Sequence, residues 1–295
     1  MTFTPGDRIL VVANPATRRN AEHMIAHLRR ATPAGVELDV CLTTKPGEAR
    51  EIAAARLPGA KLLVAIGGDG TVADCAQPLI DLDVPLAVMP GGSTNITARE
   101  QGVPVSPEQA ARLIFAPHVT RRIDAGQCDD RIFLHMAGAG FDARFFAATN
   151  PDLKRRFGWL AYVPAGIAAL RHRPVLFHLK LDGEEVDVRS PLVLVANGPS
   201  IIHPRIRLHP AIRDDDGMLD VLVFTATSPV QLARTMGRLS ALQLEKSPYV
   251  MHRRTTALHL HADSDVPMEV DGDVFGTTPR KFRIVPRAIR MVVPG

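Results

Sequence analysis

Short apolar runs alternate with amphipathic stretches over the first 120 residues of the chain. Four runs are almost continuously apolar and stop at a small or polar residue, and they cover residues 8–15, 36–43, 61–68 and 84–92. Helical patterns separate them, at residues 18–31, 46–57 and 70–80, and a capping sequence at 106–109 opens another. Buried strands separated by helices are typical of a parallel sheet covered on both faces. The pattern therefore predicts a doubly wound α/β domain.

From about residue 118 the pattern changes to alternation of polar and apolar positions. The expected strands lie at residues 119–127, 131–140, 174–190, 191–198, 218–226, 256–263, 268–273 and 281–286. Asp182-Gly183 is a strong two-residue hairpin signal within the third of these stretches. Two helical stretches interrupt the strands, at residues 151–171 and 228–242. The second part of the chain is therefore expected to be mainly antiparallel, with a domain boundary near residue 120.

The overall composition is that of a folded globular protein. Apolar residues make up 46% of the chain and charged residues 22%, which excludes a disordered, collagen-like or disulfide-scaffold protein. Three cysteines far apart in the sequence suggest reduced thiols, and the first residues contain no apolar segment of the secretory type. Both features predict a cytoplasmic protein.

Positive charge is concentrated between residues 144 and 173. Six basic residues and one acidic residue give this stretch a charge of +5, although the whole chain carries only +4. Within it, the apolar segment 157–170 is too short to span a bilayer. Basic residues next to aromatic ones are typical of a segment that lies on an anionic membrane surface. An ordinary helix with its apolar side in the core is the alternative interpretation.

The sharpest local motif is IGGDGTV at residues 66–72, between an apolar strand and a helix. Its three glycines allow backbone N–H groups to approach an anion, and the following helix adds its positive N-terminal end. Asp69 would repel phosphate unless a cation lay between them, so a metal-bound nucleotide fits this loop. A second glycine turn, at 89–99, follows the next strand. Because ligands bind at the carboxyl ends of parallel strands, the two loops together predict one ligand crevice.

Familiar nucleotide motifs of other kinds are absent. The chain has no GxxxxGK[ST] sequence and no protein-kinase HRD or DFG set. The segment GAGFDA at 138–143 fits a dinucleotide pattern only formally, because it falls in the strand-rich part and lacks the later acidic residue.

GGDGT at 67–71, followed by PGGSTN at 90–95, resembles the diacylglycerol kinase catalytic domain of bacterial lipid kinases and sphingosine kinases. The resemblance extends over nearly the whole chain through Asn14-Pro15, Thr44, Ile123-Asp124, GAGFDA at 138–143, KRRFGWLAY at 154–162, HPAIRDDDGMLDV at 209–221 and VDGD at 270–273. It implies a nucleotide-binding α/β domain over residues 1–120 and an antiparallel β-sandwich lipid-substrate domain over residues 121–295. The active site would lie in the cleft between the domains, and the extreme C-terminus could pack back on the first domain.

The resemblance also implies roles for individual residues. Asp220 would help to hold a structural magnesium ion together with backbone carbonyls, and Asp124 would link that metal to the catalytic centre through water. Asp273 stands where the family's DGE motif has the glutamate taken to be the general base, and Asp69 with a bound cation would neutralise charge. The expected ATP contacts are Asn14, Thr44, Gly67, Gly68, Asp69, Gly70, Thr71 and Ser93.

Two residues depart from the family pattern. Asp273 is one methylene shorter than the usual glutamate, so the reaction requires the backbone or the substrate to move closer. Ile96 stands where many members have an aspartate, which removes a carboxylate from the region of the nucleotide and its metal.

The function that the resemblance implies is an ATP- and Mg²⁺-dependent lipid kinase of phospholipid metabolism, with diacylglycerol as acceptor and phosphatidic acid as product. Its lipid would be presented at a membrane surface containing anionic phospholipid, so the protein would associate transiently with the inner face of the membrane. No nucleic-acid partner is expected, and a homodimer is an open alternative. Two other functions remain: an NAD kinase-like enzyme, which also carries GGDGT and two similar domains, or a lipid- and nucleotide-binding regulatory protein that lost catalysis through Ile96 and Asp273.

Overall fold

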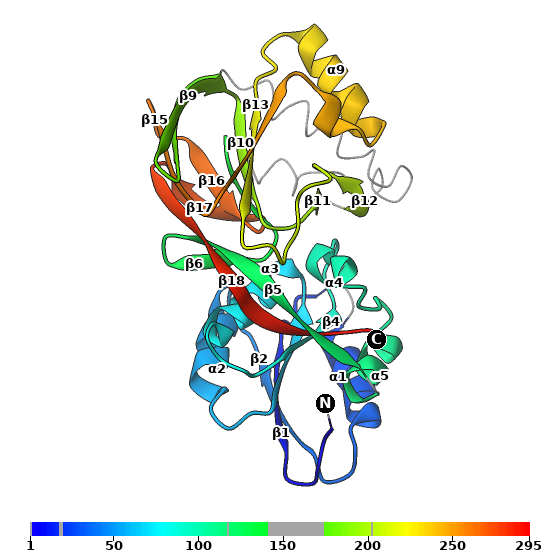
Figure 1. Cartoon of the computed structure of the whole chain (residues 1–295). Coiled ribbons are helices and arrows are strands. Elements are labelled where there is room, and N and C mark those ends of the chain that lie inside the picture. The colour runs from blue at the N-terminus through cyan, green and yellow to red at the C-terminus, as the bar shows by residue number, and fades with distance from the viewer. Residues whose placement is uncertain (1, 18–19, 117, 141–173, 202) are drawn as a thin grey trace. The chain divides into compact units, whose positions relative to one another are not determined.

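The computed structural model describes residues 2–17, 20–116, 118–140, 174–201 and 203–295 (Figure 1). The chain divides into two compact units, which we describe separately. Unit 1 comprises Met1–Asp124 and Arg287–Gly295, and unit 2 comprises Ala125–Pro286. The chain passes from one unit to the other within strand β5 (Val119–Cys128) and returns within strand β18 (Arg280–Val293). The helix expected at 151–171 and the basic segment lie outside the described residues.

Unit 1 is built on a parallel sheet, as the apolar runs predict. Four of its strands lie in the order β2-β1-β3-β4, and the C-terminal end of β18 lies beside β4, with Met291 opposite Leu86. Every residue of β3 and β4 is buried, because helices cover both faces of the sheet. The bounds are β1 (Arg8–Ala13), β2 (Glu37–Leu42), β3 (Leu62–Gly67) and β4 (Leu86–Pro90).

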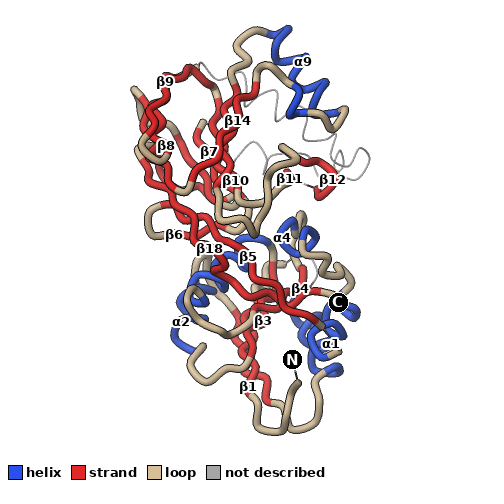
Figure 2. Tube along the Cα trace, viewed as in Figure 1, coloured by secondary structure: helices blue, strands red, loops and turns tan. Residues whose placement is uncertain are grey.

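The helices of unit 1 form two layers around this sheet (Figures 1 and 2). Helices α1 (Ala21–Ala31) and α5 (Pro107–Phe115) pack against each other, and α2 (Glu48–Arg56) packs against α3 (Asp69–Ala76). A short 3₁₀ turn, Gln77–Leu79, follows α3, and a short helix α4 (Ile96–Glu100) follows β4. The core on the α1 and α5 side contains Met24, Leu28, Ile66, Met89 and Ile114. The predicted doubly wound α/β domain is therefore confirmed.

Two large antiparallel sheets dominate the described part of unit 2. The first comprises the N-terminal part of β18 followed by β15 (Ala257–Ala262), β8 (Val175–Leu181) and β9 (Glu184–Ser190). The second has the order β14-β13-β10-β7-β16-β17, and its strands are Val250–Thr255, Leu219–Phe224, Leu192–Ala196, Met136–Ala139, Pro267–Val270 and Asp273–Thr277. Side chains of both sheets meet in one core that includes Phe177, Leu179, Val193, Val221 and Leu258. This is the antiparallel β-sandwich that the sequence predicts.

Smaller elements complete unit 2. Strand β6 (Arg131–Phe133) pairs with β5, and β11 (Ser200–Ile201) pairs with β12 (His203–Arg207). Helix α9 (Pro229–Ser240) follows the second-sheet strand β13, and a 3₁₀ turn, Leu244–Lys246, follows it. Ser228 and Gln231 form a capping box at the start of α9, which is why the predicted helix at 228–242 begins there.

The local predictions hold best where the turn chemistry is strong. Asp182 and Gly183 have φ values of 46° and 99° and join β8 to β9, as their sequence predicts. The strand expected at 131–140 is divided into β6 and β7. The backbone groups of Leu134 and His135, between these two strands, bond to the side chains of Asp271 and Asn197 and to the backbone of residues 197 and 198 instead of continuing one ladder. Strands β14 and β17 were not predicted, since their sequences alternate weakly.

Candidate functional site

The two glycine loops of unit 1 lie against each other at the carboxyl ends of β3 and β4. Strand β3 ends at Gly67, and helix α3 begins two residues later at Asp69. The N–H of Gly91 donates to the carbonyl of Gly67 over 2.8 Å, which extends the β3–β4 pairing into both loops. This contact is consistent with the prediction from the sequence that both loops flank one ligand crevice.

Close backbone approach explains why glycine occupies these loops. A Cβ atom added to Gly92 would lie 2.5 Å from the Cα of Gly68. A Cβ atom added to Gly67 would lie 2.5 Å from the Thr71 side chain. A larger residue at Gly92 would have to displace the loop that contains Gly68, because backbone atoms in contact cannot move aside as a flexible side chain can. A larger residue at Gly67 would have to displace the side chain of Thr71.

Asp69 fastens the first loop to the second. Its Oδ1 accepts a hydrogen bond of 3.0 Å from the N–H of Thr97 in the first turn of α4. Asn95 precedes that helix with φ 49° and makes no cap bond with its own side chain. Asp69 therefore caps α4 from a distant part of the sequence, a role that the local sequence did not predict.

Asn95 is a further residue that sequence reasoning missed as part of the site. It is only 4% exposed, its Oδ1 accepts the N–H of Gly92 over 2.8 Å, and its Nδ2 donates to the Gly92 carbonyl over 2.9 Å. Its place at the end of the PGGSTN motif was the available signal. Ile96, the residue that departs from the family pattern, is 3% exposed and begins α4.

The remaining residues expected to contact ATP also lie at the ends of strands in unit 1. Asn14 follows β1, donates its N–H to Ile66 and accepts the N–H of Ala16 on its Oδ1. Thr44 follows β2, and both its N–H and its hydroxyl donate to the Glu48 carboxylate. These bonds lower the pKa of Glu48, the bond from the Thr44 N–H most strongly. Ser93 is exposed in the second glycine loop, and Thr71 is buried in α3.

Asp124 is the last residue of the first segment of unit 1. It is 1% exposed, and its Oδ1 accepts a hydrogen bond of 2.7 Å from the N–H of Arg287, where the chain enters unit 1 again. The carboxylate therefore joins the two chain segments that form this unit.

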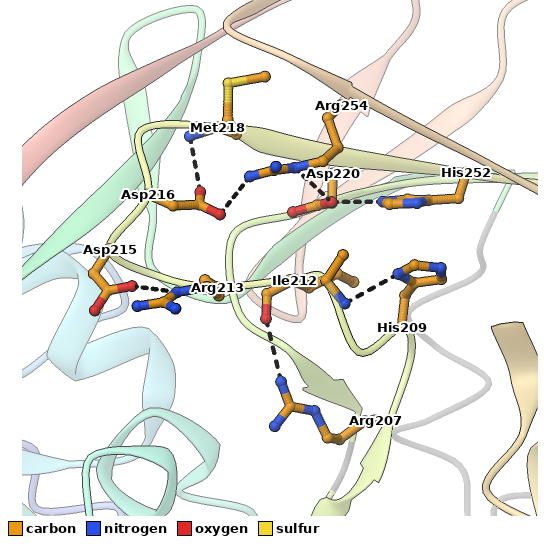
Figure 3. A network of polar contacts seen from close by, with 11 residues as sticks. Arg207, His209, Ile212, Arg213, Asp215, Asp216, Met218, Asp220, His252 and Arg254 are labelled. Carbon is orange, nitrogen blue, oxygen red and sulfur yellow. Dashed lines mark hydrogen bonds and ion pairs between the residues drawn. The ribbon is translucent and has the colours of Figure 1, made fainter.

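Asp220 lies in unit 2 at the centre of a polar network (Figure 3). The residue is fully buried in β13, and its Oδ1 lies 2.6 Å from Nε2 of His252 and 3.6 Å from Nε of Arg254. Arg254 also pairs with Asp216. The ring of His209 stacks on that of His252, with 4.0 Å between centroids.

The residues around Asp220 fit a hard cation in one respect. Its second oxygen, Oδ2, is buried and has no hydrogen-bond partner in the protein. No group of three or more His, Cys, Asp or Glu side chains that could hold a metal occurs among the described residues. Magnesium at this carboxylate would therefore need further oxygen ligands of another kind, and the resemblance implies backbone carbonyls for that role.

Asp273 begins strand β17 in unit 2, directly after the turn that ends β16. Its carboxylate is 57% exposed and pairs with Arg131 of β6. Two further carboxyl groups lie within four residues of it along the chain. Burial raises the pKa of Glu269 to about 8 and that of Asp271 to about 6. Glu269 and Arg131 carried no signal in the sequence, because their environment depends on strands that pair across the sheet.

The candidate residues thus fall into both units. The expected ATP contacts and Asp124 lie in unit 1, and Asp220 and Asp273 lie in unit 2. Among the described residues, no helix has the length and apolar character needed to cross a membrane.

Two family models match the chain. The diacylglycerol kinase catalytic domain matches residues 8–128, and the YegS C-terminal NAD kinase beta sandwich-like domain matches residues 135–293. A Pseudomonas aeruginosa protein named "Probable lipid kinase YegS-like" is 30% identical over 98% of this chain and 95% of its own length. The diacylglycerol kinase of Bacillus subtilis is 27% identical over 97% of this chain and 96% of its own length.

Another relative and a solved structure add to this comparison. An uncharacterised Synechocystis protein is 27% identical over 80% of this chain. The chain spans only 55% of the length of that protein. A crystal structure of a diacylglycerol kinase from Bacillus anthracis has a TM-score of 0.72 and 21% identity, covering 99% of this chain and 98% of the other, and shares the fold. The chain therefore belongs to the family of kinases that join a diacylglycerol kinase catalytic domain to a YegS C-terminal β-sandwich-like domain, and it is a phosphotransferase.

Proposed function

We propose that this kinase transfers the γ-phosphoryl group of ATP to a lipid hydroxyl, with diacylglycerol as the acceptor and phosphatidic acid as the product. The observation that carries the proposal is the contact of two glycine loops at the carboxyl ends of β3 and β4, fastened by Asp69. The similarity to a diacylglycerol kinase along almost the full chain supports the choice of acceptor.

The glycine loops are suited to bind the phosphates of a nucleotide. Because Gly67, Gly68 and Gly92 carry no side chains, backbone N–H groups can approach an anion closely, and α3 directs its positive end toward the same loop. Asn14, Thr44, Thr71 and Ser93 are the other proposed ATP contacts. Contact between ATP and the Thr44 hydroxyl would compete with the bond from Thr44 to Glu48.

Magnesium is the proposed metal cofactor. When bound, the ion would neutralise charge on the phosphates, with Asp69 close to the nucleotide's ion. Asp220 would hold a structural ion through its free Oδ2, and Asp124 would connect that ion to the site through water.

Asp273 is the proposed general base. Transfer needs the proton of the lipid hydroxyl to leave as its oxygen attacks phosphorus, and a carboxylate within hydrogen-bond reach accelerates such steps by roughly 10² to 10⁴. The Asp273 side chain is 57% exposed and carries a carboxylate that can accept that proton, and the same carboxylate pairs with Arg131.

The lipid is proposed to reach the enzyme at a membrane surface that contains anionic phospholipid. Support comes from the charge of +5 on residues 144–173 and their aromatic neighbours in the sequence. That segment lies outside the described residues, so this part of the proposal rests on composition.

An NAD kinase-like activity is the second candidate, favoured by one observation. The family model that matches residues 135–293 describes its domain as NAD kinase beta sandwich-like. NAD also offers hydroxyl groups as acceptors, and it requires no membrane.

The deciding experiment measures transfer of label from [γ-³²P]ATP to separate acceptors. Diacylglycerol, monoacylglycerol, a sphingoid base, ceramide and a glycolipid are presented in mixed micelles, and NAD is presented in buffer. We expect labelled phosphatidic acid from diacylglycerol. Labelled NADP without lipid product would overturn the proposal in favour of the NAD kinase. Nucleotide binding without any transfer would favour a regulatory protein that has lost catalysis.

Asp273 is tested in the same assay by two substitutions. Asp273→Asn keeps the size and turn preference of the side chain but removes its basicity, so turnover should collapse while ATP affinity and melting temperature persist. Asp273→Glu restores the residue usual in the family, and its activity reports whether the pocket accepts the longer side chain. Parental turnover of Asp273→Asn would refute the base assignment.

A further inference from the structure

Two Asp-Gly hairpin turns in unit 2 share positive φ values at both residues. Asp182 and Gly183 have φ values of 46° and 99°, and Asp271 and Gly272 have φ values of 48° and 88°. Each turn joins two antiparallel strands directly, so that the residue after the glycine begins the next strand. In the second turn that residue is Asp273, which pairs across the turn with Val270.

The carboxylate of Asp271 is bound to a loop far away in the sequence. Its Oδ2 accepts the N–H of Leu134 over 2.9 Å, and its Oδ1 accepts the N–H groups of His135 and Met136, each over 3.0 Å. The N–H of Asp271 in turn donates to the carbonyl of Met136 over 2.9 Å. One aspartate therefore makes four hydrogen bonds to three consecutive residues.

The loop that Asp271 holds is itself fixed on its other side. Nδ2 of Asn197, a fully buried residue, donates to the Leu134 carbonyl over 2.8 Å. The backbone N–H groups of Asn197 and Gly198 donate to the His135 carbonyl over 2.9 and 2.8 Å. Residues 134–136 thus support the β16–β17 turn and are themselves hydrogen-bonded to residues that follow β10.

The same chain segment also reaches the carboxylate of Asp273. Arg131 lies in β6, three residues before Leu134, and its guanidinium pairs with that carboxylate. The position of the turn and the orientation of the Asp273 side chain therefore depend on one stretch, residues 131–136.

We infer that Asp271 is a positioning residue: by binding the N–H groups of residues 134–136, it holds the turn that places Asp273 for proton transfer. The inference rests on the proposed function, in which Asp273 is the base. Asp271 does not touch the reacting atoms in this role. A displacement of a catalytic group by 1 Å can slow a reaction by about 10²-fold. Loss of the bonds that hold the turn should therefore lower kcat more than it lowers the stability of the fold.

The test compares Asp271→Asn with a matched substitution at the other turn. Asparagine tolerates positive φ and keeps one acceptor oxygen. Its NH₂ group, however, would face the N–H of Leu134, which now donates to Oδ2 of Asp271. Asp182→Asn is the control, because the Asp182 carboxylate also accepts three hydrogen bonds, two from Thr256 and one from Ala257. Melting temperature, kcat and the KM for ATP are measured for each variant.

We expect Asp271→Asn to lower kcat by about 10²-fold with the KM for ATP unchanged. Asp182→Asn should change kcat by less than about twofold, even if it lowers the melting temperature as much as Asp271→Asn does. In an Asp273→Asn background, Asp271→Asn should cause no further loss of kcat, since a positioning residue acts through the residue that it positions.

Several results would overturn the inference. Parental kcat of Asp271→Asn, an equal loss in Asp182→Asn, or a further loss in the Asp273→Asn background would show that Asp271 has a general structural role. If Asp273→Asn itself kept parental turnover, the base assignment would fall and the positioning role with it, so the two failures can be told apart.

A second pair of variants serves if Asp271→Asn does not fold. Gly272→Ala and Gly183→Ala both place a Cβ in open space at positive φ, so both strain only their own turn. A lower kcat in Gly272→Ala alone supports the positioning role, and equal kcat in both variants overturns it.

Discussion

Glu269 makes the stability of this protein depend on pH in a calculable way. The residue lies in β16 opposite Gly138 of β7 and is only 5% exposed. Burial raises the pKa of its carboxyl group from 4.5 to about 8, the nearby Asp271 adds to the rise, and His135 opposes it. The folded protein therefore keeps Glu269 protonated at neutral pH, whereas the unfolded chain does not.

The sign and size of the effect follow from this difference. Below pH 4.5 both states hold the proton, and Glu269 contributes no pH dependence. Between pH 4.5 and about 8 only the unfolded state releases the proton, so the free energy of unfolding falls as pH rises. At about 1.4 kcal/mol for each pH unit, the loss is about 3 kcal/mol between pH 5 and pH 7.

Glu269→Gln removes this dependence without changing the size of the side chain. We expect the free energy of unfolding of the variant, relative to the parent protein, to increase by about 3 kcal/mol from pH 5 to pH 7. Urea unfolding followed by circular dichroism at pH 5, 6, 7 and 8 measures the difference between variant and parent, in which the contributions of groups that do not interact with Glu269 cancel. Glu184→Gln, an exposed position in β9, is the control and should leave the pH profile unchanged.

Parallel pH profiles of Glu269→Gln and the parent would refute the reasoning. They would mean that Glu269 ionises equally in the folded and unfolded states, and that burial in β16 does not hold its proton.

Three further substitutions test the two glycine loops and the basic segment. Asp69→Asn should lower kcat by about 10²-fold or more with little change in melting temperature, because asparagine keeps an oxygen that can cap α4; near-parental turnover would contradict the role of the carboxylate. Gly92→Ala should destabilise unit 1 by about 1–3 kcal/mol and weaken ATP binding, and thermal unfolding with and without ATP measures both effects. The control Gly237→Ala in α9 should have neither effect, because its Cβ meets open space. Replacing the three basic residues 154–156 by alanine should weaken sedimentation with anionic vesicles by about 3 kcal/mol at low salt, and less at high salt. Unchanged sedimentation would favour a core helix for that segment.

The sequence by itself determined the layers of the molecule and the family to which it belongs. Apolar runs such as 61–68 predicted strands buried on both faces, because covering both faces of a parallel sheet leaves few polar positions. Asp182-Gly183 predicted its turn, since only a few residue types accept two consecutive positive φ values. The GGDGT and PGGSTN motifs marked the two glycine loops, and the comparisons confirmed the family that these motifs indicated.

Only the tertiary structure decided how these pieces depend on one another. Gly68 and Gly92 are glycines because their backbones touch, and Asp69 caps a helix that begins 27 residues later in the sequence. Asp271 binds the N–H groups of a loop 135 to 137 residues before it, a contact that no local pattern contains. The physical reason is that strand periodicity and turn propensity depend on near neighbours, whereas burial of a carboxylate and its hydrogen bonds depend on which strands pair. Several strand pairs in these sheets, such as β7 with β16, join residues that are far apart along the chain.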